Sequence, residues 1–384
     1  MIQFIDLKKQ WSLHEKSIRA RMDAVLAHGK YIMGPEVAEL ESVLAEFAGA
    51  GHCVGCASGT DALLMALMAI GAGPGDAVFT TPFTFIATSE VVSLLGATPV
   101  FVDVDPLTLN IDPEALDRAA SAVAGNSSKD HPLPKTERPL TPKAVIPVDL
   151  FGIPADYDAL DAVASKHGLA VIEDAAQSFG AGYKGRKACS LSPLAATSFF
   201  PAKPLGCFGD GGAVFAKDAQ TAAVLKSIRV HGQGSDKYDN VRIGLNARLD
   251  TLQAAVLLAK MEFFPSELES RQRVAGWYTQ ALAGVVETPA VPAGVKSAWA
   301  QYSIRHPRRD EIIAGLRDKG IPAMIYYPRP LHLLGAYEHL AYREGDFPVC
   351  ETASKVILSL PMHPYLTEED ASFIARSVKD VLAG

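Results

Sequence analysis

The first two thirds of the chain alternate short apolar runs with stretches of helical periodicity. The apolar runs are typical of buried strands, and they cover residues 53–56, 77–80, 98–102, 144–148 and 169–173. The helical stretches cover residues 61–71, 85–96, 113–125 and 155–167. Because strands that alternate with helices form βαβ units, we expect an α/β fold with a mostly parallel sheet flanked by helices.

Residues 125–142 interrupt this alternation. They are polar and contain four prolines, which predicts an exposed loop without regular structure. A lid over a functional site is one interpretation of this loop, and a surface insertion is the one we prefer.

The pattern changes again after residue 260. We expect a long helix with a kink near Pro265, because an internal proline removes a helical hydrogen bond. The elements expected after it are a strand at 301–305, a helix at 310–320, a strand at 322–327 and a helix from Glu368. This predicts two domains: residues 1–258, with an N-terminal helical segment, and a smaller α+β domain of residues 259–384.

The composition narrows the class of protein. Hydrophobic residues make up 48% of the chain and the formal net charge is −7, which argues against a disordered chain and against a nucleic-acid binder. Residues 62–73 form the longest apolar stretch, which is shorter than the ~20 residues of a membrane span. The five cysteines are sparse and odd in number, and no secretion signal is recognisable, so we expect a cytoplasmic protein.

Two segments place reactive side chains in unusual surroundings. Asp174 ends an apolar run, and open α/β sheets bind ligands at the C-terminal ends of their strands. Lys203 lies between apolar residues and two prolines, and desolvation there would free its amine as a nucleophile for an aldehyde. The alternatives are that Asp174 caps the next element and that Lys203 is an exposed lysine in a tight glycine-rich turn.

A third segment, Ser58-Gly59-Thr60, joins a strand to a helix. Free N–H groups at such a junction favour an anion, and the Thr60 hydroxyl adds a donor, although an ordinary N-cap explains the same residues. Together the three segments suit pyridoxal phosphate, which needs a lysine for its aldehyde, a carboxylate for its ring nitrogen and a cradle for its phosphate.

The chain resembles the DegT/StrS-type nucleotide-sugar aminotransferases, which have the aspartate-aminotransferase fold (fold type I). The motifs that carry the resemblance are HGKYIMGPEVAELE, SGTDAL, PFTFIAT, EDAAQSFGA, SFFPAKPLGCFGDGGA, RVHGQG, GLNARLDTLQAA and LSLPMHP. Within the family, these motifs are most similar to those of enzymes that aminate C3 of a UDP-linked 3-keto-2-acetamido glucuronic acid. The resemblance implies a homodimer with shared active sites, an amino-acid donor such as glutamate, and a role in surface glycan or lipopolysaccharide precursor synthesis.

The resemblance also implies roles for individual residues. Lys203 would bind the cofactor as a Schiff base and move protons, Asp174 would pair with the ring nitrogen, and pyridoxamine phosphate would be the intermediate form. The other implied cofactor contacts are Gln177 at the ring hydroxyl, Phe85 on the ring face, Gly59, Thr60 and Ser198 at the phosphate, and Asn246 from the other subunit. The implied substrate contacts are Tyr31, Met33, Gly34, Arg248, Tyr326 and Tyr327, with Arg248 a candidate for a uronate carboxylate.

Two features limit or narrow this interpretation. Many relatives have His-Tyr-Pro where this chain has Tyr326-Tyr327-Pro328, and tyrosine cannot carry the positive charge of histidine. The Cys53 and Cys56 pair matches C-x-x-C, but a zinc site needs two further ligands and no second such motif is present, so we expect no metal.

Three alternatives stay open beside the 3-keto sugar. The first is an aminotransferase for a 4-keto-hexose nucleotide sugar. The second is a sugar dehydratase of the same family, against which Lys203 argues because such relatives replace this lysine with histidine. The third is a non-catalytic sensor that binds the cofactor or the sugar.

Overall fold

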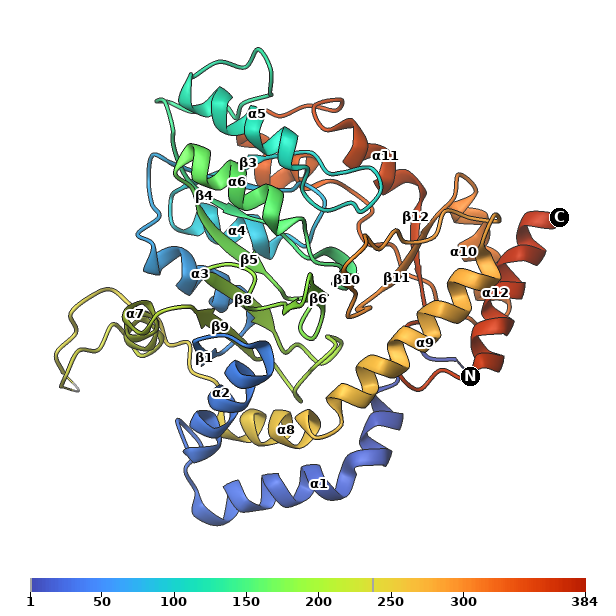
Figure 1. The fold of residues 1–384 in the computed structure, drawn as a ribbon, viewed down its shortest axis with the longest axis horizontal. Coiled ribbons are helices and arrows are strands. Elements are labelled where there is room, and N and C mark those ends of the chain that lie inside the picture. The colour runs from blue at the N-terminus through green and yellow to red at the C-terminus, as the bar shows by residue number, and fades with distance from the viewer. Residues whose placement is uncertain (1, 237) are drawn as a thin grey trace.

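The computed structural model describes residues 2–236 and 238–384, and a seven-stranded sheet lies at its centre (Figure 1). The order of the strands is β1-β9-β8-β5-β4-β2-β3. Their bounds are His52–Cys56 (β1), Asp76–Thr80 (β2), Thr98–Phe101 (β3), Thr141–Ile146 (β4), Ala170–Asp174 (β5), Leu194–Ser198 (β8) and Gly212–Ala216 (β9). Because only β9 runs against its neighbours, the predicted α/β fold with a mostly parallel sheet is confirmed.

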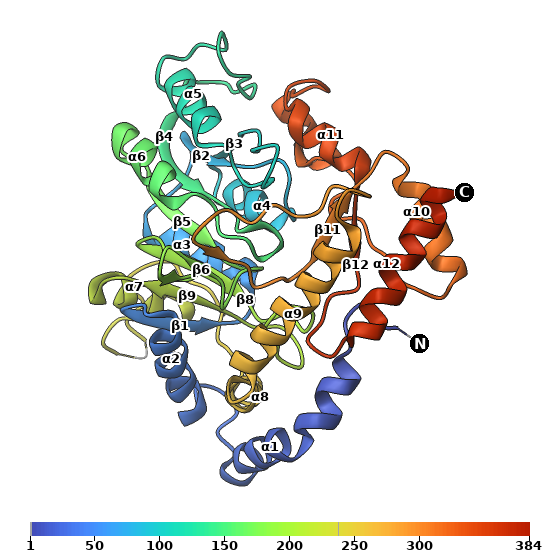
Figure 2. The same ribbon diagram turned by 45° about the vertical axis from the view of Figure 1, so that its right-hand side comes forward.

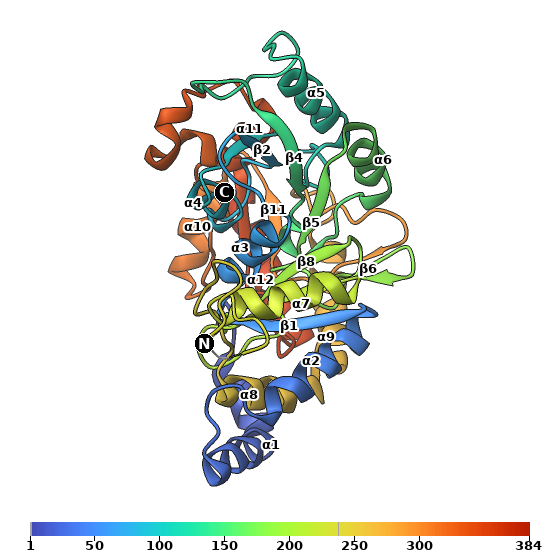
Figure 3. The same cartoon turned by 90° about the vertical axis from the view of Figure 1, so that its left-hand side faces the viewer.

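Helices cover both faces of this sheet (Figure 3). Along β2, Val78 packs into the cluster with one set of helices, and Ala77 and Phe79 pack into the cluster on the other face. The first set is α3 (Gly59–Ala69), α4 (Ala87–Leu94) and α7 (Ala219–Arg229), and the second is α5 (Pro113–Ala124) and α6 (Tyr157–His167). Both faces are therefore shielded from water, which explains why the strand sequences are continuous apolar runs.

The long helix expected after residue 260 is present, but the kink expected near Pro265 is wrong. Two helices occupy the region, α8 (Thr251–Met261) and α9 (Phe264–Leu282), and Figure 1 shows them as separate ribbons. Pro265 lies in the first turn of α9, where its missing N–H would have no helical partner in any case. Below them in Figure 1 lies α1 (Leu7–His28), and α2 (Pro35–Ala48) packs against both α8 and β1.

The C-terminal part of the chain packs beside the sheet (Figure 2). It combines β11 (Tyr302–Arg305) and β12 (Ile357–Leu360) with α10 (Arg309–Asp318), α11 (Pro348–Val356) and α12 (Glu368–Ala383). The strand expected at 322–327 is wrong, because only Met324 pairs with β12, through Ser359. Pro322 and Pro328 flank this segment and cannot donate to a ladder.

The remaining strands are short. Two further expectations concern the bounds of the loop at 125–142 and of the two domains. A small sheet is formed by β6 (Gly182–Tyr183), β7 (Arg186–Lys187) and β10 (Val295–Lys296). Residues 125–140 contain no helix or strand, as predicted, and residues 141 and 142 begin β4. The predicted domain boundary between residues 258 and 259 falls inside α8, and the division itself stays a prediction.

Candidate active site

Asp174 is the last residue of β5 and is 4% exposed. Thr88 Oγ1 donates a hydrogen bond of 2.8 Å to its Oδ2, and the Ala176 N–H donates one of 3.2 Å to Oδ1. Burial raises the pKa of the Asp174 carboxyl, while these two bonds and the charge of Lys203 act in the opposite direction. The result is a desolvated carboxyl at the C-terminal edge of the sheet, which suits a ligand that can carry positive charge.

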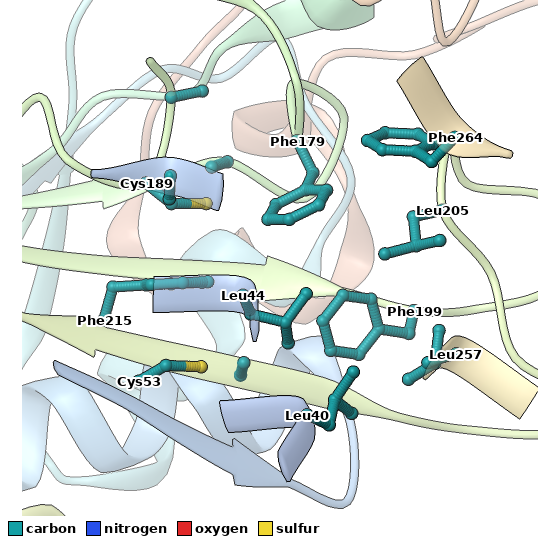
Figure 4. Close-up of a cluster of buried hydrophobic side chains, with 14 of the residues drawn as sticks. Leu40, Leu44, Cys53, Phe179, Cys189, Phe199, Leu205, Phe215, Leu257 and Phe264 are labelled. Carbon is teal, nitrogen blue, oxygen red and sulfur yellow. The ribbon is translucent and has the colours of Figure 1, made fainter. Parts of the chain in front are cut away.

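Lys203 lies in a closed loop that follows β8. The N–H of Cys207 donates to the Phe199 carbonyl at 2.8 Å, which joins the two sides of the loop, and the N–H of Lys203 donates to the Phe200 carbonyl at 2.9 Å. Phe199 and Leu205 pack in one apolar cluster with Leu257 of α8 (Figure 4). Burial lowers the pKa of the Lys203 amine, and the charge of Asp174 opposes this shift, so the two groups lie within electrostatic reach.

The N-terminus of α3 forms a tight cradle with β8 and β9. Ser58 caps the helix by accepting a 3.0 Å hydrogen bond from the Asp61 N–H. A Cβ on Gly59 would lie 2.6 Å from Ser198 Cβ, and a Cβ on Gly212 would lie 2.3 Å from the Ser58 carbonyl oxygen. Only glycine fits at both positions, so the backbones approach closely and leave the N–H groups of a helix start available to an anion.

These groups match the needs of pyridoxal phosphate. The cradle suits its phosphate, the Asp174 carboxyl suits its ring nitrogen, and the amine of Lys203 suits its aldehyde. The structure therefore brings Asp174 and Lys203 together, and it brings Gly59 together with Ser198, while Thr60 follows Gly59 in the first turn of α3.

Gln177 has a more constrained position than its sequence indicated. Its Oε1 accepts a 2.8 Å hydrogen bond from the Phe151 N–H, and its Nε2 donates to Tyr327 Oη at 3.4 Å. Tyr327, expected at the substrate, thus lies beside a residue expected at the cofactor. Burial raises the pKa of the Tyr327 hydroxyl, which keeps it a neutral hydrogen-bond donor.

Residues 31–34, which were expected at the substrate, contact the start of α8. The N–H of Gly34 donates to Thr251 Oγ1 at 3.0 Å, and the N–H of Thr251 donates to the Tyr31 carbonyl at 2.9 Å. Arg248 is half-buried and lies three residues before Thr251. The backbone of Arg248 is close to the 31–34 segment, since Asp250 pairs with Ile32.

Several expected contacts lie at the surface of the single chain. Phe85 is 58% exposed, Tyr31 49% and Met33 40%, and Asn246 is exposed as well. Tyr326 is half-buried, with its ring centre 6.3 Å from that of Phe4. Phe85 nevertheless lies next to the group around Asp174, because its carbonyl accepts a 3.4 Å hydrogen bond from the N–H of Thr88.

Three features of the site were not predicted from the sequence: Thr88, Phe151 and the close approach of Gly212. The glycine run after Lys203 was a usable signal for Gly212. Thr88 and Phe151 reach the site from distant parts of the chain, and neither has a local pattern that distinguishes it. Cys53 and Cys56 are buried free thiols whose pKa is raised by burial, which suits interior packing.

A family model for the DegT/DnrJ/EryC1/StrS aminotransferases matches residues 13–379. The chain belongs to this family. The aminotransferase is 48% identical over 379 residues to the UDP-2-acetamido-2-deoxy-3-oxo-D-glucuronate aminotransferase of Pseudomonas aeruginosa, with 98% of this chain and 99% of that protein covered. Its resemblance to that enzyme, noted from the motifs, is thereby confirmed.

Solved structures agree with this assignment. The aminotransferase superposes with a TM-score of 0.94 on a family member from Brucella abortus, at 50% identity and with 99% of both chains covered. It superposes with a TM-score of 0.85 on a protein described as a sugar aminotransferase from Streptococcus pneumoniae in its PLP form, at 26% identity and with 96% of both chains covered. The aminotransferase is therefore a pyridoxal-phosphate-dependent enzyme that acts on sugars.

Within residues 2–236 and 238–384, no cluster of three or more His, Cys, Asp or Glu side chains is arranged to hold a metal ion. Over the same ranges, none of the helices combines the length and apolar character that crossing a membrane requires.

Proposed function

We propose that this aminotransferase transfers the amino group of L-glutamate to C3 of a UDP-linked 3-keto-2-acetamido uronic acid. The observation that carries the proposal is the 48% identity, over almost the whole chain, to an enzyme named for that sugar. The product would be a precursor of surface glycans such as lipopolysaccharide. A cytoplasmic location fits the five cysteines, which are all free and buried.

The residues around Asp174 would bind and orient the cofactor. The cradle of Gly59, Thr60 and Ser198 would hold the phosphate, and Asp174 would keep the ring nitrogen protonated. When bound, pyridoxal phosphate supplies an electron-accepting ring that stabilises the charge left on a carbon that loses its proton. Gln177 Nε2, whose bond to Tyr327 is long at 3.4 Å, would turn toward the ring hydroxyl, and Phe85 would cover the ring face.

Lys203 would act as the acid and base of both half-reactions. Its lowered pKa leaves more of the amine neutral near physiological pH than in an exposed lysine. It would remove the proton from the α-carbon of the amino donor, deliver it to the neighbouring cofactor carbon, and reverse these steps for the sugar. Lys203→Ala should therefore keep the fold and lose turnover by several orders of magnitude, and normal turnover would contradict the proposal.

Arg248 would select the uronic acid. A guanidinium recognises a carboxylate through paired hydrogen bonds, and Arg248 lies near the 31–34 segment that would border the nucleotide sugar with Tyr326 and Tyr327. Arg248→Met should raise KM for a uronic-acid substrate and leave KM for glutamate nearly unchanged. Arg242→Met, at an exposed arginine of the same loop, is the matched control.

We further propose a homodimer whose two sites are shared. Asn246 is exposed in the single chain, while the carbonyl of the next residue, Ala247, accepts a 3.1 Å hydrogen bond from the Ala57 N–H. The side chain of Asn246 would therefore reach the phosphate bound by the other subunit. Mixing Lys203→Ala with Asn246→Ala subunits should restore activity in part, and no recovery after verified subunit exchange would contradict shared sites.

The decisive experiment follows visible absorbance of the purified protein. A yellow protein that bleaches with glutamate and regains its colour with the UDP-linked 3-keto uronic acid would support the proposal. Recovery only with a 4-keto-hexose nucleotide sugar would replace the substrate. A coloured protein that responds to no amino donor would favour the sensor or the dehydratase.

A further inference from the structure

Lys260 carries a buried amine that the proposed mechanism does not use. The side chain is 3% exposed, and its Nζ donates a 2.6 Å hydrogen bond to the Gly206 carbonyl. The same Nζ lies 4.6 Å from the centre of the Phe208 ring. In the described part of the chain it forms no ion pair with an acidic group, so its desolvation is offset by one carbonyl, one ring face and the more distant charge of Glu267.

The carbonyl that Lys260 holds belongs to the loop that carries Lys203. The two sides of this loop touch, because a Cβ on Gly206 would lie 2.6 Å from the Pro201 carbonyl oxygen. The hydrogen bond between Cys207 and Phe199 closes its base. A shift of Gly206 would therefore move the whole turn on which Lys203 stands.

Gln253 holds the next part of the same loop. Its Oε1 accepts a 2.7 Å hydrogen bond from the Phe208 N–H, and its Nε2 donates to the Phe208 carbonyl at 3.4 Å. Gln253 and Lys260 are two helical turns apart, so they lie on one side of α8. One helix thus fixes the base of the loop by side-chain bonds to the backbone of two nearby residues.

We propose that Lys260 and Gln253 are positioning residues that hold loop 199–209 so that the amine of Lys203 stays opposite Asp174. The inference rests on the proposed role of Lys203 as the residue to which pyridoxal phosphate attaches. Methionine fills nearly the same volume as lysine without donating to Gly206, so Lys260→Met releases the carbonyl and leaves the packing in place. Lys260→Arg keeps a donor at the same position.

Two ligands separate the placement of Lys203 from the integrity of the site. Pyridoxal phosphate attaches to Lys203, whereas pyridoxamine phosphate has no aldehyde and binds through the same ring and phosphate contacts without attachment. The experiment adds each ligand to the cofactor-free protein. Attachment at Lys203 is trapped with borohydride and quantified by mass spectrometry, and the affinity for pyridoxamine phosphate is measured by calorimetry.

Lys260→Met should slow attachment about tenfold, because a hydrogen bond from a charged donor is lost. Its affinity for pyridoxamine phosphate should stay within about twofold. Lys260→Arg should recover most of the rate. Lys226→Met, at an exposed lysine of α7, makes the same chemical change away from the loop and should leave both measurements unaltered.

Each remaining outcome decides the matter. An unchanged attachment rate in Lys260→Met, or an equal loss of affinity for pyridoxamine phosphate, would overturn the positioning role. If Lys260→Met does not fold, Gln253→Ala carries the test, since Gln253 is partly exposed, and it should slow attachment about threefold. A wild-type protein that never attaches the cofactor at Lys203 would overturn the proposed function itself, whereas the variant results bear on the loop alone.

Discussion

Thr88 Oγ1 donates a hydrogen bond of 2.8 Å to Asp174 Oδ2. Both side chains are buried. Thr88 lies in the first turn of α4 and Asp174 ends β5, so the bond joins two segments that are far apart in the sequence. It lowers a carboxyl pKa that burial raises. Thr88 therefore helps Asp174 stay ionised.

The first prediction concerns this hydroxyl. Thr88→Val should raise the pKa of Asp174 further, so pyridoxal phosphate should bind more weakly. The acid limit of binding, which is the pH below which the cofactor is no longer bound, should move to higher pH. A spectrophotometric binding titration across pH measures both effects. Thr80→Val also deletes a buried threonine hydrogen bond, to the Ile146 carbonyl, and should cost about 1 kcal/mol of stability without moving the acid limit. The same acid limit in Thr88→Val and wild type would refute the role.

The second prediction is that Asp174→Asn stabilises the cofactor-free protein. The folded-state pKa of Asp174 is raised, so its ionised form at neutral pH opposes folding and the amide removes that cost. We expect a gain of about 1 kcal/mol in the free energy of unfolding, together with loss of turnover. Thermal unfolding at pH 7 and at lower pH measures this gain in stability. The gain should shrink as the pH falls, because Asp174 of the wild type then becomes protonated. Asp210→Asn, at an exposed position, is the control; a lower melting temperature for Asp174→Asn would contradict the argument.

The third prediction concerns two fully buried carboxyls, Asp149 and Glu173. Asp149 accepts hydrogen bonds from Ser178 Oγ at 2.7 Å and from Tyr157 Oη at 2.9 Å. Burial raises the pKa of Asp149 to about 7, and it raises the pKa of Glu173 as well. An unfolded aspartate titrates near pH 4, so the folded state holds protons that the unfolded state releases between about pH 4 and about pH 7.

Stability contributed by protonated Asp149 should therefore be lost as the pH rises toward 7. Asp149→Asn should flatten this part of the profile, with a difference from wild type of more than about 1 kcal/mol across the window. Chemical denaturation of the cofactor-free protein from pH 5 to pH 8 provides the measurement. Parallel profiles for the two proteins would show that Asp149 does not hold a proton in the folded state.

The fourth prediction tests the cradle. Gly59→Ala adds a methyl group 2.6 Å from Ser198 Cβ, which should cost about 1–3 kcal/mol and reduce cofactor affinity by at least about tenfold. Gly276→Ala, on an exposed face of α9 with no atom within 4 Å of the new Cβ, should instead stabilise the protein by about 0.5–1 kcal/mol. Equal cofactor affinity in Gly59→Ala and wild type would place the phosphate elsewhere.

The local elements of the large sheet follow from the chain itself. Residues 53–56 and 77–80 are apolar runs, and each lies within a strand. Two predictions were wrong, the strand at 322–327 and the helix kink near Pro265. At both places the position of a proline decides whether a strand ladder or a helix can form. The strands that flank Lys203, β8 and β9, were not recognised, because glycine and alanine give them a weak strand signal.

The residues of the candidate site also divide into those that the sequence predicted and those that it did not. Lys203, Asp174 and the start of α3 were found from sequence because each carries its own local pattern, and motifs linked them to one family. Thr88, Phe151 and Lys260 were not found, since each acts through a contact with a residue far along the chain.

The sequence by itself predicted most strands and helices of the large sheet, and it indicated Lys203 and Asp174 as candidate reactive residues, because local composition and periodicity carry that information. Only the tertiary structure decided that a threonine of α4 holds Asp174 and that a lysine of α8 holds the loop of Lys203. The physical reason is that parallel strands and their helices place the ends of distant segments at one edge of the sheet. Desolvation and hydrogen bonding at that edge exist only once the chain is folded.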